Sequence, residues 1–412
     1  MVEIILPGTY VTVKDEALIS AGRIASGIIG IVGTAAKGEI DKVNIIGSFS
    51  EALEIFGGTK PDDELTLIRS LEQIYNNGGR TVYAVRTGPE PATTKPADQT
   101  QESNQGTQPP QSGARSIDDE TNTEETYDPT FTGRTADQTN PGTTNTQTTE
   151  TPQPTKTAKD YYTASLAKLE NEPVNIVLLA GQDAGTPEMV TILGGHLKNT
   201  AGIKRERIGI IGSSSGANIE TITKHDLNND RLIFVAPGLK SSKETLSGAY
   251  LAAAVAGLIA SLPVQASPTN KSLAITGLSD EFTSSQLEAL VGARVLAVEK
   301  REGFRIVKGI TTSTNTAWHQ ITTRRIVDFA VYGVRSACDP YIGKLNNERV
   351  RGAMKATIDA FLTRMVQDEA LISYELTVTA TRNQEIDGEA IVTMTVRPTF
   401  SIDFIKVTMY LG

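Results

Sequence analysis

The 412-residue sequence contains one cysteine, one tryptophan and three histidines. A single cysteine, Cys338, excludes a disulfide within the chain and any zinc site that needs several cysteines. Because Cys338 falls in a helical pattern, we expect a buried thiol. The histidines at 196, 225 and 319 show neither metal-ligand spacing nor a paired carboxylate, so we expect no metal and no cofactor.

The sequence also lacks a hydrophobic run long enough to cross a bilayer. The best candidate, Leu246–Leu262, is rich in alanine and about 17 residues long, against the roughly 20 apolar residues of a membrane helix. We therefore expect a buried core helix there and no membrane insertion. Glu3 and Pro7 interrupt the early apolar run, which argues against a signal peptide and favours assembly in the cytoplasm. A formal net charge of −9 and few aromatic residues argue against direct binding of nucleic acid.

Large apolar residues are scarce between residues 88 and 158. This segment holds nine of the 18 prolines and no Val, Leu or Met. Its 11 acidic and 4 basic residues account for seven of the nine net negative charges. Such a segment cannot bury enough surface to offset the entropy lost on ordering it. We expect a polar, low-complexity surface insert, whose role the sequence does not specify.

The remaining sequence alternates short apolar runs with helical patterns. This alternation is typical of an α/β body, in which helices cover both faces of a mostly parallel sheet. Strands are predicted at 27–33, 80–86, 174–180, 207–211, 231–236 and 272–276, with a strand pair in 296–312. Helices are predicted after Ser48 (where Glu51 completes a capping-box pattern) and at 65–75, 187–200, 217–225, 243–262 and 284–294.

Two further helices, at 325–342 and 347–371, and two closing strands give the last hundred residues an α+β character. The predicted organisation therefore has four parts. They are an N-terminal strand-donating arm (1–22), the α/β body (23–87 and 159–312), the insert (88–158) and a C-terminal domain (313–412).

Both ends of the sequence are rich in strand-forming residues. After Pro398, which cannot donate to a strand ladder, the apolar residues alternate with one irregularity at 404–405. They are Phe400, Ile402, Phe404, Val407, Met409 and Leu411. The segment 2–13 has the same character, and its candidates for pairing are Tyr10, Val11 and Val13. Because extended apolar ends aggregate unless something pairs with them, we predict strand exchange between subunits.

The order of several other segments is informative. A double-arginine run at 321–328 precedes an Asn-rich break at 342–348 and a long helix at 351–371. Earlier segments are a Pro-Gly-Thr-Tyr run at 6–11, a Gly-rich strand at 28–38 and a small-residue helix at 247–261. Together these segments resemble contractile tail sheath proteins, the subunits of phage tails and related contractile injection systems. The insert departs from that resemblance, because it does not look like the folded β insertion usual in the family.

The resemblance implies a structural subunit without enzymatic activity. Such subunits form stacked rings in a helical homo-oligomer around an inner tube protein and exchange terminal strands with their neighbours. Contraction of the sheath, triggered at the baseplate, drives the tube through a target envelope, so baseplate and terminal cap proteins are implied partners. The particle would be assembled in the cytoplasm.

The resemblance also implies an electrostatic tube contact in the C-terminal domain. Apolar periodicity in the long helix predicts a core-facing stripe made of Val350, Ala353, Met354, Thr357, Ile358, Phe361 and Met365. Arg351 and Lys355 fall on the opposite side with Arg349 beside them, and they are the candidates for the tube contact. The alternative is an ordinary solvated helix face, where such charges contribute ~0–1 kcal/mol.

Three other functions remain open at this point. The Gly-Ser-Ser-Ser-Gly run at 212–216 matches a nucleophile elbow with Ser214 as nucleophile, which would make the chain an α/β hydrolase. Its candidate partners are His225, Asp226, Asp280 and His319. A phosphate group could bind at the same helix N-terminus, but the lysine of a Walker motif is missing. A self-assembling surface-array protein would also use terminal strands, although it would need an export signal.

Overall fold

The computed structural model describes residues 26–58, 65–88, 156–241 and 244–411, and every structural statement below refers to these residues. Two predicted features lie outside them: the N-terminal arm with its pairing candidates Tyr10, Val11 and Val13, and residues 89–155 of the insert.

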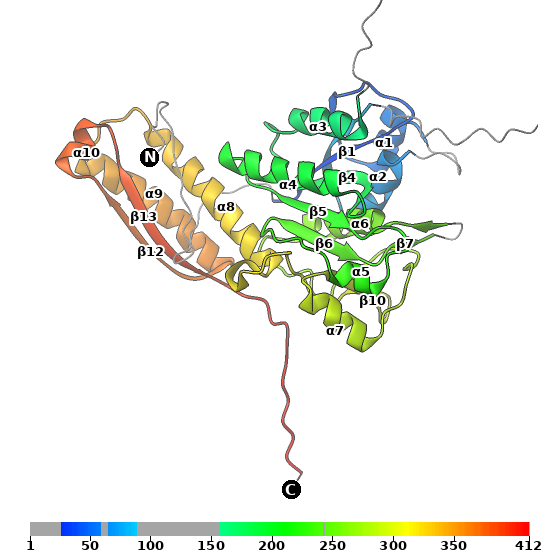
Figure 1. The fold of residues 1–412 in the computed structure, drawn as a ribbon. Coiled ribbons are helices and arrows are strands. Elements are labelled where there is room, and N and C mark those ends of the chain that lie inside the picture. Colours follow the sequence, from blue (N-terminus) through cyan, green and yellow to red (C-terminus); the bar gives the residue numbers. More distant parts are fainter. Residues whose placement is uncertain (1–25, 59–64, 89–155, 242–243, 412) are drawn as a thin grey trace, which may run out of the picture. The chain divides into compact units, whose positions relative to one another are not determined.

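The body is built on a nine-stranded sheet with the order β2–β3–β1–β4–β5–β6–β10–β11–β9 (Figure 1). The strands are β1 (Ile28–Gly33), β2 (Val43–Ile46), β3 (Thr81–Arg86), β4 (Ile176–Asp183), β5 (Ile208–Gly212), β6 (Leu232–Ala236), β9 (Ser272–Leu273), β10 (Leu296–Lys300) and β11 (Phe304–Ile306). The six strands from β3 to β10 in this order run parallel, whereas β2, β11 and β9 are antiparallel additions at the edges.

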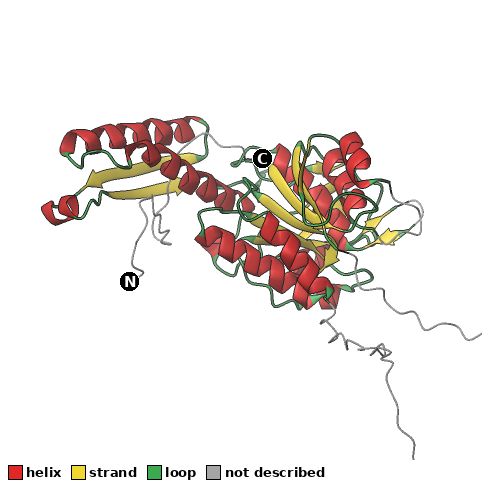
Figure 2. Cartoon of the chain, turned by 90° about the horizontal axis from the view of Figure 1, so that it is seen from above, coloured by secondary structure: helices red, strands yellow, loops and turns green. Residues whose placement is uncertain are grey.

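Helices cover both faces of this sheet, as Figure 2 shows. One face packs against α1 (Phe49–Phe56), α2 (Leu67–Asn76) and α6 (Gly248–Ser261). The other packs against α3 (Ala158–Lys168), α4 (Pro187–Gly202), α5 (Ile219–Thr223) and α7 (Ser284–Gly292). Strand β6 illustrates the cause, because Ile233 and Val235 enter the first core while Leu232, Phe234 and Ala236 enter the second. This architecture confirms the predicted α/β class.

Helix α6 is buried along almost its whole length, which confirms the core helix predicted at 243–262. Its alanine and glycine residues let neighbouring backbone approach closely; a Cβ on Gly257 would clash with the carbonyl oxygen of Ile74 in α2. None of the described helices is both long and apolar enough to span a membrane.

The last part of the chain packs two helices against a β-hairpin. These elements are α8 (Ile321–Cys338), α9 (Glu348–Gln367), β12 (Leu371–Thr379), α10 (Arg382–Ile386) and β13 (Ile391–Pro398). Strands β12 and β13 pair antiparallel, with Tyr374 opposite Val396 and Leu376 opposite Met394. Together with α8 and α9 they enclose a separate core that contains Cys338, whose thiol is buried as predicted.

Some predicted boundaries are wrong. Helix α8 begins at Ile321 rather than 325, and the strand expected at 272–276 shrinks to the two residues of β9. The closing run is a strand only as far as Pro398, because the following residues find no ladder partner within the described chain. Four two-to-three-residue elements complete the fold: β7 (Leu239–Lys240), β8 (Thr245–Leu246) and the 3-10 helices Thr316–Trp318 and Asp339–Tyr341.

Candidate assembly sites

Residues 399–411, here called the tail segment, form no strand and expose their apolar side chains. The exposed fraction rises from 54% at Phe400 to 94% at Leu411. The predicted pairing residues are all on this surface: Phe400, Ile402, Phe404, Val407, Met409 and Leu411. Ile405 and Tyr410 are exposed as well, so beyond Asp403 both faces of the segment carry apolar side chains. A contiguous apolar surface of this kind marks an interaction site, and its pairing with another subunit stays a prediction.

The β12–β13 hairpin offers a surface of the complementary kind. One of its faces packs on α9 through Tyr374, Leu376 and Met394, and the other presents polar side chains such as Glu375 and Thr377. In the described part of the chain the hairpin is a two-stranded sheet, so neither of its outer edges has a paired strand. Two-stranded sheets are only marginally stable, and open edges are templates for an added strand.

The long helix α9 confirms part of the predicted core stripe and corrects the rest. Met354, Ile358 and Met365 are buried as predicted, whereas Ala353 and Thr357 are exposed. The fully buried positions advance mainly by four residues and include Leu362, so the buried stripe is narrower than predicted. Val350 and Phe361 are half-buried.

The three candidates for a tube contact divide into two groups. Arg349 and Lys355 are exposed on α9. Arg351 is not on a solvated face, because its Nη1 lies 3.0 Å from Glu385 Oε1 and 2.8 Å from Asn346 Oδ1. Its partner Glu385 belongs to α10, a helix that the sequence patterns did not predict. Arg351 therefore ties α9 to the turn between the hairpin strands.

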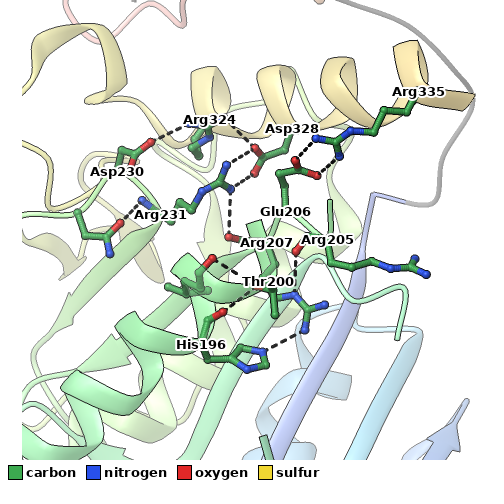
Figure 3. A network of polar contacts seen from close by, with 12 residues as sticks. His196, Thr200, Arg205, Glu206, Arg207, Asp230, Arg231, Arg324, Asp328 and Arg335 are labelled. Atoms are coloured by element: carbon green, nitrogen blue, oxygen red, sulfur yellow. Dashed lines mark hydrogen bonds and ion pairs between the residues drawn. The ribbon is translucent and has the colours of Figure 1, made fainter. Parts of the chain in front are cut away.

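A buried network of charges joins α8 to the sheet of the body (Figure 3). Asp328 accepts hydrogen bonds from Arg231 at 2.7 and 3.0 Å and from Arg324 at 2.8 Å. Arg324 also donates to Asp230 at 2.7 Å, and its guanidinium lies 4.2 Å from the centre of the Trp318 ring. Burial alone would raise the pKa of Asp328, but the charges and hydrogen bonds of the two arginines hold it below its usual range.

A further ion pair between α8 and the body lies towards the end of α8. Arg335 donates two hydrogen bonds, of 2.6 and 2.7 Å, to the carboxylate of Glu206, which precedes β5. Both side chains are nearly buried, with exposures of 11% and 8%. Charges so deeply buried are tolerated only when an opposite charge or several hydrogen bonds compensate them. The pairs therefore fix α8 to the body at both its beginning and its end.

Two further arginines are buried without a carboxylate partner. Arg207 has no exposed surface, and its guanidinium donates to the carbonyl oxygens of Leu169, Arg205, Glu170 and Glu172. Its Nη1 also lies 3.1 Å from His196 Nε2. Burial, aided by the charge of Arg207, lowers the pKa of His196 to about 3, so this ring is a neutral acceptor.

Arg325 on α8 is likewise buried, and its guanidinium also bonds to carbonyl oxygens. It donates to the carbonyl oxygens of Ser26, Leu262 and Pro263, which ties the helix to the end of α6. Burial lowers its pKa to about 10. The double arginine at 324–325 was recognised from the sequence, but its partners and those of Arg207 were not. An arginine directly before an apolar strand, as at 207 and 231, was the available signal.

The hydrolase candidates do not assemble into a catalytic triad. In the described residues, Ser214 forms no hydrogen bond with a histidine or an aspartate; its carbonyl accepts from Ala217. Both ring nitrogens of His225 are hydrogen-bonded elsewhere: Nε2 lies 2.6 Å from the Ala293 carbonyl oxygen, and Nδ1 accepts from the Leu227 amide. Asp280 accepts from the neighbouring Ser279, and Asp226 and His319 make no bond to Ser214. The described residues contain no group of three or more candidate metal ligands.

Comparison with known proteins finds two sheath domains along the chain. A family model described as the phage tail sheath protein central domain matches residues 155–312. The model of the phage tail sheath C-terminal domain matches residues 313–412. No match was found among curated proteins.

Several solved structures share the fold over nearly the whole chain. The helical sheath of the anti-feeding prophage in its contracted state is 15% identical, with a TM-score of 0.64 and 99% of each chain covered. The contracted sheath complex of the extracellular contractile injection system PVC is 13% identical, with a TM-score of 0.64 over 100% of this chain and 98% of that one. A sheath tail protein from Listeria innocua is 13% identical, with a TM-score of 0.61 over 93% and 94%. With two sheath models matching most of its length, the chain belongs to the phage tail sheath protein family.

Proposed function

We propose that the chain polymerises helically around an inner tube protein and that contraction of this polymer drives the tube through a target envelope. The observation that carries the proposal is the presence of an exposed apolar tail segment and an open-edged hairpin in the same chain. Residues 404–411 are as long as the eight-residue strand β13, so they suit a ladder along a hairpin edge. Each copy can therefore donate one strand and accept another.

A strand ladder suits a contracting polymer for a physical reason. Main-chain hydrogen bonds are short and directional, and they hold two chains together while the bodies attached to them tilt and slide. Added strands would also cover the open hairpin edges, which are otherwise an aggregation hazard. The energy for contraction would then reside in subunit packing, without an enzymatic step.

The proposed partners follow from the same account. Another copy of this chain is the first, and an inner tube protein is the second, with Arg349 and Lys355 on α9 as its electrostatic contact. A protein of the same fold, 16% identical with a TM-score of 0.63, was solved in the baseplate of the anti-feeding prophage. It supports a baseplate protein as a further partner. A terminal cap protein, which the family resemblance implies, completes the proposed set.

Deleting Phe404–Gly412 tests strand donation directly. The deletion removes most of the exposed apolar surface of the tail segment. It leaves Thr399–Asp403, which contact the rest of their own chain. We expect folded monomers that form no long polymers, measured by sedimentation velocity and electron microscopy. A matched variant that keeps the length, with Phe404, Val407 and Met409 changed to serine, should behave alike. Polymers of normal length from the deleted chain would refute strand donation.

A further inference from the structure

The beginning of the tail segment is held by the chain that would donate it. Gln320 contacts the backbone of Ser401 on both sides: its Oε1 accepts from the Ser401 amide at 3.1 Å, and its Nε2 donates to the Ser401 carbonyl at 3.3 Å. A neighbouring strand residue would offer the same donor and acceptor pair. The Gln320 amide therefore replaces a strand at this one position.

A second contact lies two residues further along. Asp403 Oδ2 accepts from Gln320 Nε2 at 3.1 Å and lies 3.4 Å from Lys308 Nζ. The Lys308 and Asp403 side chains are only 16% and 12% exposed, so solvent screens this pair weakly. Lys308 Nζ also lies 5.1 Å from the centre of the Phe404 ring. Together, Gln320 and Lys308 hold the segment from Ser401 to Phe404, and we call these two residues the tail clamp.

The tail clamp is itself firmly placed. Gln320 forms an isolated antiparallel bridge with Ile310, two residues after Lys308. It stands at the N-cap of α8, yet its side chain makes no capping bond. Its Oε1 also accepts from the Thr322 hydroxyl at 3.4 Å, which fixes the orientation of the amide. The side chain that could cap the helix is thus directed to the tail segment instead.

The contacts select which face of the tail segment is turned outwards. Ser401 and Asp403 face this chain and are half-buried, whereas Phe400, Ile402 and Phe404 between and beside them are 54%, 78% and 77% exposed. In a strand that packs on its own chain the apolar face would lie inwards. Here the tail clamp binds the polar face, and the apolar face is exposed to solvent. The arrangement suits a segment whose apolar partner is another molecule.

The competing partner of the tail segment is the hairpin that precedes it. Strand β13 ends at Pro398, and its outer edge has no paired strand in the described chain. A turn over the next five residues, 399–403, would lay residues 404–411 along that edge. Closing so short a loop costs little entropy, so self-pairing would have a high effective concentration compared with pairing between subunits. The tail clamp holds residues of that turn, Ser401 and Asp403, in an extended course.

We propose that Gln320 and Lys308 are positioning residues for strand donation: they keep the tail segment off its own hairpin and present it to the hairpin of a second copy. The inference rests on the proposed strand exchange and adds the device that directs the donor outwards. Figure 1 shows the tail segment leaving β13 and continuing away from the hairpin.

The test combines Gln320→Ala with Lys308→Met in the full chain. Losing the clamp should raise the protein concentration needed for polymers by about fivefold, the factor that corresponds to one typical net hydrogen bond. Hydrogen exchange of the dilute variant should show new protection over residues 404–411, because the released segment pairs with its own β13. The parent monomer should leave these amides unprotected. Gln286→Ala is the matched control, since its Oε1 also accepts from a backbone amide, of Thr283, at 2.9 Å.

A second measurement separates positioning from damage to the fold. A labelled peptide with the sequence of residues 404–411 should bind chains truncated after Asp403 equally well with and without the two substitutions, because the acceptor hairpin is untouched. A peptide affinity that falls as much as polymerisation does would overturn the positioning role. The positioning role would also be overturned if the full-length double variant polymerised as the wild type does while the truncated chain formed no polymers. Polymers formed by the truncated chain would instead overturn strand donation itself.

Discussion

Replacing Asp328 by asparagine tests whether the buried charge network holds α8 on the body. The carboxylate contacts both Arg231 and Arg324, and its side chain is 14% exposed. Removing one partner of a buried ion pair costs about 3–5 kcal/mol because a buried charge is left uncompensated. Arg324 keeps Asp230 at 2.7 Å, so we expect a loss near the lower end, about 3 kcal/mol in the free energy of unfolding.

The assay is urea unfolding followed by the fluorescence of Trp318, the single tryptophan, which lies against Arg324. The chain truncated after Asp403 should be used, so that polymerisation does not add to stability. Glu220→Gln is the control, because its pair with Lys224 has side chains 69% and 73% exposed and contributes ~0–1 kcal/mol.

The pH dependence gives an independent check. The pKa of Asp328 is held low in the folded chain, so its contribution is present above the ordinary carboxyl pKa and is lost as the pH falls through the folded value. The difference between parent and Asp328→Asn should therefore be constant from about pH 6 to 8 and shrink below about pH 4. A loss as small as that of Glu220→Gln would refute the view that this network secures α8.

Three other predictions concern the tube contact, the insert and His196. Charge reversal at Arg349 and Lys355 should weaken co-sedimentation with the tube protein at low salt and matter less as salt rises; an unchanged result at low salt would remove both residues from the contact. Deleting residues 90–155 should leave polymers of normal length in electron micrographs, because a polar insert adds no core; loss of soluble protein would show that it is structural. His196 has a pKa of about 3, so it should cost about 2 kcal/mol of stability at pH 5 relative to pH 8; this slope should disappear in urea titrations of His196→Gln, and its persistence would contradict the buried neutral ring.

The sequence predicted those elements whose apolar pattern depends only on neighbouring residues along the chain. Strands β5 and β6 are short apolar runs ended by glycine or proline, and the small residues of 248–261 could only form a buried helix. Helix α10 was missed because it has five residues and no buried side chain; the local contacts of Thr381 and Gln384 form its capping box. The terminal apolar residues were predicted to be an assembly surface because their alternation had no partner in the sequence; the structure exposes those of 400–411, and their pairing with another subunit stays a prediction.

The rest depended on contacts between distant residues. Glu206 and Arg335 are 129 positions apart, and Arg351 and Glu385 are 34 apart, so no spacing rule connects them. Arg351 was therefore placed with the solvated candidates, and only the fold revealed its partner. Gln320 and Ser401 are 81 positions apart and have ordinary polar character, so the tail clamp left no pattern in the sequence.

The central claim is that copies of this chain join by strand exchange into a helical sheath. Cryo-electron microscopy of the chain, expressed alone and together with its tube protein, tests it most directly. The account predicts hollow, helically striated tubes in which residues 404–411 of one copy form a strand along the β12–β13 hairpin of another. Compact, separate particles in both preparations, or tubes whose hairpin edges carry no added strand, would contradict it.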